Sequence, residues 1–220
     1  MSILIIMKDI IAGGMVGFSQ VGVGHPFDTA KVLIQNKKPW SGLPLSSYYK
    51  GWKFPLLSAA IFNSIVFPIY ERTVDYTNNS FASGFIAGAI VSPVVYIFDV
   101  GKIRQQTLQT VNFRHLYTTY GKDSTLYRET LAMSLYFGSY FNLRKNDFHP
   151  LTAGGIAGLV NWTFTYPLDV IRSRQMAQNI PFRKALNQGN LWTGYSICAG
   201  RAVIVNAANF WVYETVKKYL

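Results

Sequence analysis

Long stretches without a charged side chain divide the chain into six segments separated by short polar ones. With His25 taken as neutral, the uncharged runs cover residues 10–27, 54–70, 81–98, 130–143, 150–168 and, interrupted by Arg201, 191–213. A helix needs about 20 residues to cross the hydrocarbon core of a bilayer, and interfacial side chains can complete the shorter runs. The pattern therefore predicts six membrane-spanning helices in three hairpins.

Glycines recur at one spacing in the first, third and fifth segments. The pairs, four residues apart, are Gly13/Gly17, Gly84/Gly88 and Gly154/Gly158. In a soluble helix each glycine would cost about 1 kcal/mol relative to alanine. In a membrane the same spacing lets helix backbones approach closely, so the recurrence favours a membrane protein.

Polar residues repeat in phase with these segments. Eleven residues after each glycine pair stands an aspartate, and three residues later a base: Asp28/Lys31, Asp99/Lys102 and Asp169/Arg172. Each unit restarts at a glycine that a tyrosine follows 19 residues later: Gly51/Tyr70, Gly121/Tyr140 and Gly194/Tyr213. These coincidences indicate three tandem two-helix repeats, near residues 5–75, 76–146 and 147–220, in one membrane domain that covers residues 1–220.

Charge and composition narrow the class of function. With 21 Lys and Arg against 10 Asp and Glu, the net charge of +11 suits a nucleic-acid binder, a protein facing anionic lipid, or a transporter of anionic or zwitterionic solutes. The bases lie at repeat-locked positions or in short loops without a readable motif, so we expect no nucleic-acid partner. The loops after the first, third and fifth segments are the more basic, which places both termini on the opposite face.

The sequence offers little for catalysis. Three histidines and the single Cys198 show no spacing for a nucleophile or a metal, so we expect neither an enzyme nor a metal site. The absence of a phosphate-binding loop leaves ATP-driven pumping unsupported. A transporter remains, with a non-transporting membrane scaffold as the alternative. The first residues show no basic leader, so we expect any targeting information to be internal.

Two segments resemble the signature of the mitochondrial carrier family, Pro-x-Asp/Glu-x-x-Lys/Arg-x-Lys/Arg. They are His25–Lys31 and Tyr166–Arg174, and the middle copy has Ile97 in place of proline. The resemblance implies a monomeric all-α membrane protein of six tilted helices with pseudo-threefold symmetry around a water-filled cavity. It also implies secondary transport by alternating access in the mitochondrial inner membrane. The short polar connections predict a compact member whose matrix-side surface helices are shortened or lost.

In the family the repeated charges pair between neighbouring repeats and form a matrix gate. The resemblance implies the pairs Asp28–Lys102, Asp99–Arg172 and Asp169–Lys31. Pairing within one helix, between residues three apart, is the alternative. Gln35 and Gln106 occupy the positions of a glutamine brace, and Met176 replaces the third glutamine.

The family also implies a cytosolic gate after the tyrosines of the even segments. The third copy, which contains Glu214 and Lys217, is complete, whereas Val74 and Phe141 replace a base and an acid in the other two. If each acid pairs with the base of the neighbouring repeat, only the pair Glu71–Arg144 can form. Three matrix pairs against one cytosolic pair predict that the unliganded protein favours the cytosol-open state.

Substrate contact points in the family lie about seven residues beyond the restarting glycines, which gives Ser58, Arg128 with Glu129, and Arg201 with Ala202. Ionisable residues inside a membrane are costly unless they face water or a partner, which marks Arg128, Glu129 and Arg201 as functional. The alternative is that Arg128 and Glu129 extend to the interface. Arginines suit a carboxylate or phosphate, and Glu129 suits an amine.

Residues 23–29 and 201–210 resemble the carnitine, ornithine and basic-amino-acid branch of the family. Where ornithine-type carriers have a glutamate, this chain has Phe62, which argues against a dibasic substrate. We expect transport of a small charged or zwitterionic metabolite, an amino acid or a carnitine-like solute. The alternative is a nucleotide or deoxynucleotide held by Arg128, Arg201 and Lys31.

Apart from its solute, the expected partner is the lipid bilayer. No cofactor is expected except bound cardiolipin. Gly51, Gly121 and Gly194 open the even helices and resemble the family's cardiolipin sites, and free N–H groups at helix N-termini attract phosphate.

Overall fold

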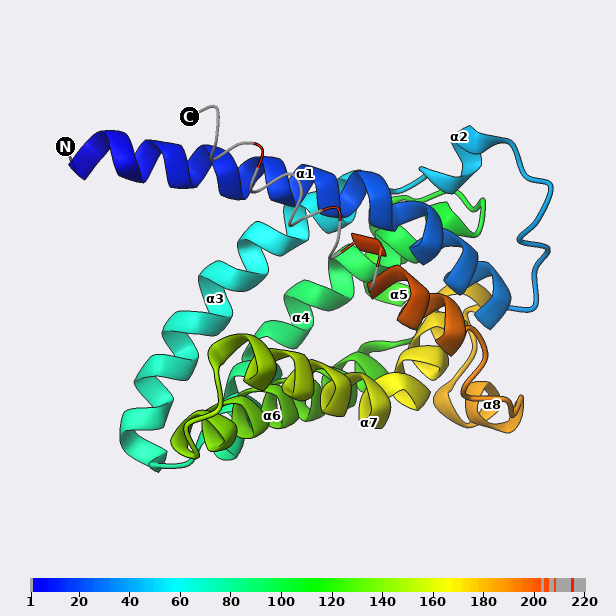
Figure 1. Ribbon diagram of the computed structural model, residues 1–220. Coiled ribbons are helices and arrows are strands. Elements are labelled where there is room, and N and C mark those ends of the chain that lie inside the picture. The colour runs from blue at the N-terminus through cyan, green and yellow to red at the C-terminus, as the bar shows by residue number, and fades with distance from the viewer. Residues whose placement is uncertain (1, 203, 206–207, 209–214, 216–220) are drawn as a thin grey trace.

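The computed structural model describes residues 2–202, 204, 205, 208 and 215, and every regular element within them is a helix (Figure 1). The long helices are α1 (Ser2–Gln35), α3 (Lys53–Thr77), α4 (Ser80–Gln106), α6 (Lys122–Lys145) and α7 (Pro150–Gln178). The short helices are α2 (Leu45–Tyr48), α5 (Phe113–Thr118) and α8 (Phe182–Asn187). Helical turns resume at residue 195. The structure agrees with the all-α class that the sequence predicts.

The connections after α1, α4 and α7 are compact, as their length predicts. Each contains one short helix, of four residues in α2 and six residues in α5 and in α8. The surface helices expected at these places are therefore shortened and not lost.

Two stretches of the described residues can cross a membrane, judged by length and composition: Leu45–Thr77 and Ser80–Gln106. The sequence argument predicts six spans because it asks only for the absence of charge, and uncharged polar residues pass that criterion. Ser134, Ser139 and Asn142 in α6 illustrate the difference. The sixth expected span lies largely outside the described residues, so the six-span arrangement stays a prediction.

Prolines lie inside the helices that carry the repeated aspartates: Pro26 in α1, Pro93 in α4 and Pro167 in α7. An internal proline removes a backbone hydrogen bond and favours a bend. In Figure 1, α1 changes direction along its length. The middle repeat thus keeps a helix proline, although Pro93 stands six residues before Asp99 and not two.

The glycine pair of α4 has the close contact that its spacing predicts. A Cβ atom on Gly84 or Gly88 would overlap the α6 backbone at Met133 or Glu129. Because glycine has no side chain, the two backbones touch directly. This contact fixes the position of Glu129 relative to α4.

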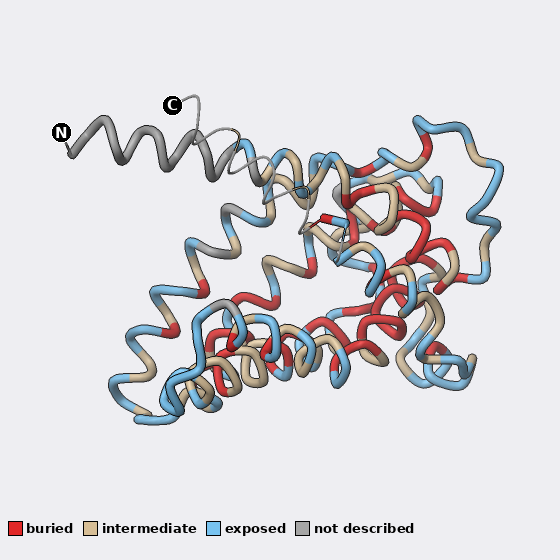
Figure 2. The backbone as a smooth tube through the Cα atoms, in the orientation of Figure 1, coloured by how far each residue is buried: buried red, intermediate tan, exposed pale blue. Residues whose placement is uncertain are grey.

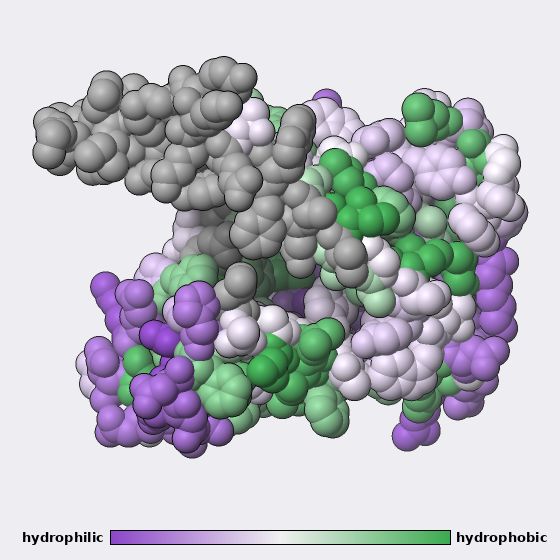
Figure 3. All heavy atoms as spheres, viewed as in Figure 1, coloured by the Kyte–Doolittle hydropathy of each residue, from purple (hydrophilic) through white to green (hydrophobic). Residues whose placement is uncertain are grey.

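Buried residues gather where α1, α4 and α7 meet, at the end of the molecule that carries the short helices (Figure 2). Hydrophilic side chains lie toward the two ends of the face shown in Figure 3, and hydrophobic ones lie between them. This banding suits helices that cross an apolar layer. The end with α2, α5 and α8 corresponds to the basic, matrix side of the expected orientation.

Candidate gate and substrate cavity

Three ion pairs link α1, α4 and α7 into a closed ring. Lys102 lies 2.8 Å from Asp28, Arg172 lies 2.7 Å from Asp99, and Lys31 lies 2.6 Å from Asp169. Each pair joins different repeats, as the family resemblance implies. Pairing within one helix occurs as well, between Arg172 and Asp169 at 2.9 Å. The two arrangements are therefore not exclusive.

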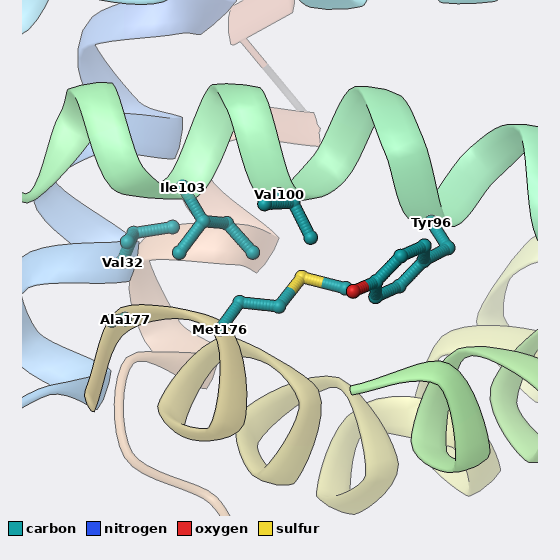
Figure 4. Close-up of a cluster of buried hydrophobic side chains, with 6 residues drawn as sticks. All are labelled: Val32, Tyr96, Val100, Ile103, Met176 and Ala177. Carbon is teal, nitrogen blue, oxygen red and sulfur yellow. The ribbon is translucent and has the colours of Figure 1, made fainter. Parts of the chain in front are cut away.

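Apolar side chains from the same helices pack beside this ring. The cluster consists of Val32 from α1, Tyr96, Val100 and Ile103 from α4, and Met176 and Ala177 from α7 (Figure 4). Val32, Val100 and Ile103 directly follow Lys31, Asp99 and Lys102 in the sequence. The helices are thus held by both charge and apolar contact at the level of the ring.

The expected glutamine brace is uneven. The Gln35 amide donates to the Asp169 carboxylate at 3.2 Å, so it contacts one ion pair of the ring. The Gln106 amide donates instead to the Thr29 hydroxyl at 3.1 Å. Met176 occupies the third position and belongs to the apolar cluster.

Glu129 belongs to the same charge network. Its carboxylate lies 3.0 Å from the Arg172 guanidinium and also accepts from Arg128, and its side chain is only 1% exposed. Arg172 therefore contacts three carboxylates: Asp99, Asp169 and Glu129. The Arg128 guanidinium lies 5.5 Å from the centre of the Trp162 ring. These positions do not fit side chains that extend to the interface.

Arg201 reaches the ring from the helical stretch that begins at residue 195. Its Nε lies 2.7 Å from Asp28, so this carboxylate contacts both Arg201 and Lys102. The guanidinium lies against the backbone of Gly24, where an added Cβ would be 3.0 Å from Nη2. Glycine at this position therefore leaves the room that Arg201 occupies.

A cavity of about 350 Å³ is bounded by these residues. Its lining includes four carboxylates, Asp28, Asp99, Glu129 and Asp169, and five bases, Lys31, Lys102, Arg128, Arg172 and Arg201. Ser58 and Phe62 from α3 also line it. Ala202 does not, which corrects the expected site: it is exposed, because neighbouring helix positions point about 100° apart.

Sequence reasoning missed Trp162, which lines the cavity between two bases. Lys31 Nζ lies 4.9 Å from its ring centre, on the side chain that Arg128 also approaches. Both contacts have the geometry of cation–π interactions. The sequence could have indicated Trp162 by its position alone. It precedes Asp169 by seven residues, about two helical turns, and therefore lies on the same face of the helix.

The amino-acid sequence is similar to those of mitochondrial carriers, the family that the ring of ion pairs and the cavity resemble. The profile of mitochondrial carrier proteins matches residues 143–220. The human mitochondrial basic amino acids transporter is 31% identical over 220 aligned positions, which cover 78% of this chain and 72% of that protein. The chain belongs to the mitochondrial carrier family. It is thus a multi-pass protein of the mitochondrial inner membrane.

Two further relatives extend the similarity along nearly the whole carrier. The mitochondrial arginine transporter BAC2 of Arabidopsis thaliana is 29% identical, over 97% of this chain and 91% of that protein. Mouse solute carrier family 25 member 45 is 26% identical over 281 aligned positions, which cover 94% of this chain and 97% of that protein. Because 281 positions exceed the 220 residues of this carrier, the relative has segments that the carrier lacks.

The cytosolic gate of the carrier differs from the expectation. Glu71 and Arg144 line a second cavity of about 690 Å³, but the structure shows no ion pair between these two described residues. The Arg144 guanidinium donates to the Phe148 carbonyl at 2.7 Å. The ring of Tyr70 stacks on Phe137, with ring centres 4.0 Å apart, and fills space between α3 and α6. Glu214 and Lys217 lie outside the described residues.

Proposed function

We propose that this carrier exchanges a small zwitterionic metabolite, an amino acid or a carnitine-like solute, by alternating access. In this proposal it acts as a monomer in the bilayer, with six spans in three repeats. The observation that carries the proposal is the cavity of about 350 Å³, whose lining presents both signs of charge and includes the closed ring of ion pairs. This volume falls at the lower end of the range for small-molecule sites.

The restarting glycines support the threefold arrangement. A Cβ on Gly51 would lie 3.1 Å from the Lys102 carbonyl of α4, and one on Gly121 would lie 3.0 Å from Met176 of α7. A Cβ on Gly194 would lie 3.6 Å from the Lys31 carbonyl of α1. Each repeat thus places its glycine against the aspartate-bearing helix of the next repeat, in cyclic order.

The charges of the cavity favour a substrate without net positive charge. Each of its four carboxylates already lies within 3.0 Å of a base. Phe62 lines the cavity where ornithine-type relatives have an acid. A second cationic group, such as the side chain of arginine, would therefore find no unpaired carboxylate among the described lining residues. The lining has five bases against four carboxylates, so a substrate carboxylate can join or replace the partner of Arg128 or Arg201, which suit planar anions.

The two gates support a cytosol-open resting state. All three matrix pairs are formed, whereas Glu71 and Arg144 are not paired. Alternating access requires one gate to be closed while the other is open, and the described residues match the cytosol-open half of that cycle.

Exchange of labelled solutes by reconstituted liposomes tests the proposal. We expect uptake of at least one zwitterion from a panel of neutral amino acids, carnitine, arginine and nucleotides. Arg201→Ala should lower uptake at least tenfold, whereas Arg183→Ala on α8, an exposed arginine outside the cavity, should not change it. Uptake of nucleotides alone would favour the alternative substrate class, and uptake of no solute would favour a scaffold.

Bound cardiolipin is a second component of the proposal. Gly121 has a φ of 123° and precedes the first turn of α6, where backbone N–H groups have no partner within the helix. Gly51 and Gly194 also have positive φ, 85° in each. Thermal unfolding in detergent should shift upward with added cardiolipin and not with phosphatidylcholine; an equal response to both lipids would argue against these sites.

A further inference from the structure

The ends of α1, α4 and α7 that lie nearest the short helices are joined by a second set of contacts, apart from the ring of ion pairs. Lys38 Nζ donates to the Thr107 carbonyl at 3.0 Å, and the Gln109 amide donates to the Ala177 carbonyl at 2.6 Å. In both contacts the donor stands ten residues after the repeated aspartate of its own repeat. The acceptor stands eight residues after the aspartate of the next repeat, so the two contacts are equivalent by position.

A third contact closes the set in the same cyclic order. The Gln178 amide, nine residues after the aspartate of its repeat, donates to the side-chain oxygen of Asn36 at 3.2 Å. Asn36 again stands eight residues after an aspartate. Arg174 adds to this contact, because its Nε donates to the Gln35 carbonyl at 3.0 Å. We call the three donors and their acceptors the collar: Lys38 with Thr107, Gln109 with Ala177, and Gln178 with Asn36.

A common turn sets the position of the first two donors. Lys37 and Leu108 have a left-handed backbone, with φ of 55° and 61°. The N–H of the residue that follows each of them donates to the carbonyl five positions earlier. This combination is a frequent way to end a helix. Because Lys38 and Gln109 directly follow the left-handed residues, the same backbone geometry brings both side chains to the neighbouring helix.

Two of the acceptors are carbonyls that a helix end leaves without a partner. The last four carbonyls of a helix accept no hydrogen bond within it. Thr107 and Ala177 stand at the ends of α4 and α7. Together with Asn36 they are at most 6% exposed, so the collar supplies donors to groups that are shielded from water. If the helix ends separate, water can replace these donors, which makes each contact modest in strength and reversible.

The collar forms a layer of its own. Eight residues of helix measure about 12 Å, so its acceptors lie well beyond the aspartates of the ring. The apolar cluster of Figure 4 extends between the two layers, from Val100 next to Asp99 to Ala177 in the collar. The six residues of the collar are not among the residues that line the cavity of about 350 Å³. Substitutions in the collar therefore leave the ion pairs and the cavity lining in place.

We propose that the collar is a second lock, which holds the matrix ends of α1, α4 and α7 together independently of the ion pairs. Lys38, Gln109 and Gln178 are then positioning residues, which set how often the matrix side opens from outside the cavity. Lys38 contributes most, because its ammonium group lies at the C-terminal end of α4, where the helix dipole favours positive charge. The inference rests on the alternating access of the proposed function and adds a layer of control that is independent of the solute.

Labelling of a buried thiol from the matrix side tests the collar without any solute. Val100→Cys, in a Cys198→Ala background, places a thiol in the apolar cluster, at a residue that is fully buried and does not line the cavity. An impermeant thiol reagent is added to inside-out inner-membrane vesicles. The reagent reaches this thiol when the matrix ends of the helices separate, so the labelling rate reports how often they do.

Lys38→Met removes the charge and the donor but keeps an unbranched side chain of similar length. We expect it to raise the labelling rate at least threefold, and Gln109→Met to raise it about twofold. The double variant should label faster than either single variant. Lys38→Arg should label as the parent, because the guanidinium keeps both the charge and the donors. The control is Lys37→Met, which removes the same charge from the exposed neighbouring residue and should also label as the parent.

A second reporter separates a lock from general loosening of the fold. Val91 lies on the same helix, nine residues nearer the cytosolic end, and is also fully buried. Val91→Cys, in the same background, is labelled from the cytosolic side in mitoplasts, whose inner membrane keeps its native orientation. A lock predicts that Lys38→Met accelerates the labelling of Val100→Cys and leaves that of Val91→Cys unchanged. Equal acceleration at both thiols would overturn the inference.

Parental labelling of Val100→Cys in the double variant would also overturn it. Exchange of solutes by liposomes is measured in parallel, so that the collar and the proposed function are judged separately. Exchange without any change in labelling contradicts the collar alone. Faster labelling at Val100→Cys, without exchange of any solute, supports the collar and contradicts the proposed function.

Discussion

Asp169 is the carboxylate of the ring whose removal should open the matrix gate most. It lies 2.6 Å from Lys31 and 2.9 Å from Arg172, and the three side chains are at most 10% exposed. Asparagine keeps the size of the side chain and an acceptor for Gln35 but removes the charge. Lys31 would then face the rings of Trp162 and Tyr166 without a carboxylate.

The structure gives the expected size of the effect. Breaking a buried ion pair by removing one partner costs about 3–5 kcal/mol, and an exposed pair is worth about 1 kcal/mol or less. Asp169 is close to the buried limit, so Asp169→Asn should destabilise the closed gate by about 3 kcal/mol, on the order of a hundredfold in the open-to-closed ratio.

Asp99→Asn provides the comparison. Asp99 is 21% exposed, and its partner Arg172 keeps Asp169 and Glu129 when Asp99 loses its charge. We expect a loss of about 1 kcal/mol, roughly fivefold in the open-to-closed ratio. The two substitutions are chemically identical, so a difference between them reflects the pairing and not the amino acid.

The assay measures how fast an impermeant thiol reagent labels Gln20→Cys, a position that lines the cavity, in the Cys198→Ala background. The reagent is added to inside-out inner-membrane vesicles, so that it reaches the cavity from the matrix side only when the gate is open. Asp147→Asn, an exposed carboxylate after α6, is the control. Labelling should be fastest in Asp169→Asn, intermediate in Asp99→Asn and slowest in the control. The reasoning is refuted if Asp99→Asn labels as fast as Asp169→Asn, or if neither differs from the control.

Two further predictions concern stability and are read from thermal unfolding in detergent. Gly88→Ala should lower the unfolding midpoint by roughly 4–8 °C, because the added Cβ overlaps the α6 backbone at Glu129. Gly22→Ala is the control: a Cβ at this position would have no described neighbour within 4 Å, so the midpoint should not fall. Arg174→Lys should lower the midpoint by a similar amount. The buried Arg174 guanidinium donates to the Gln35 carbonyl at the end of α1 and to the Gly189 carbonyl after α8. A single lysine ammonium cannot reach both carbonyls. Arg114→Lys on exposed α5 is the control, and equal midpoints in either comparison would contradict the explanation.

The resemblance to the mitochondrial carrier family predicts which charges pair between repeats, whereas the spacing alone also allows pairing within one helix. An aspartate eleven residues after each glycine pair, with a base three residues later, places equivalent groups at one depth in three helices. The distances of the three inter-repeat pairs agree with that reasoning, while their role as a gate stays a prediction. The shortening of the surface helices follows from chain length in the same way.

Spacing does not reveal contacts that depend on helix rotation and tilt. Arg201 could be placed in an apolar segment, but its contact with Asp28 depends on the space above Gly24. Glu129 was expected to receive an amine, and its contact with Arg172 depends on how α6 packs against α7. These contacts join helices that no single repeat contains.

The cytosolic side shows how side-chain size changes an expectation based on charge. Family pairing leaves Glu71 with Arg144, yet these two described residues form no ion pair. The rings of Tyr70, Phe137 and Phe141 stack beside them. The stack spans α3 and α6 and includes Phe141, which stands where the family has an acid. Aromatic packing thus occupies this position in place of a second charge.

The charge balance of the cavity is the argument behind the proposed choice between the two substrate classes that the sequence leaves open. Its described lining has one more base than it has carboxylates, and the carboxylates are all paired. A nucleotide carries a charge of about −1.5 to −2 on its terminal phosphate alone, and further phosphates add to it. One surplus base cannot neutralise that charge unless the gate pairs open first. A zwitterion adds no net charge to the cavity, and for this reason we propose a zwitterion and not a nucleotide as the substrate.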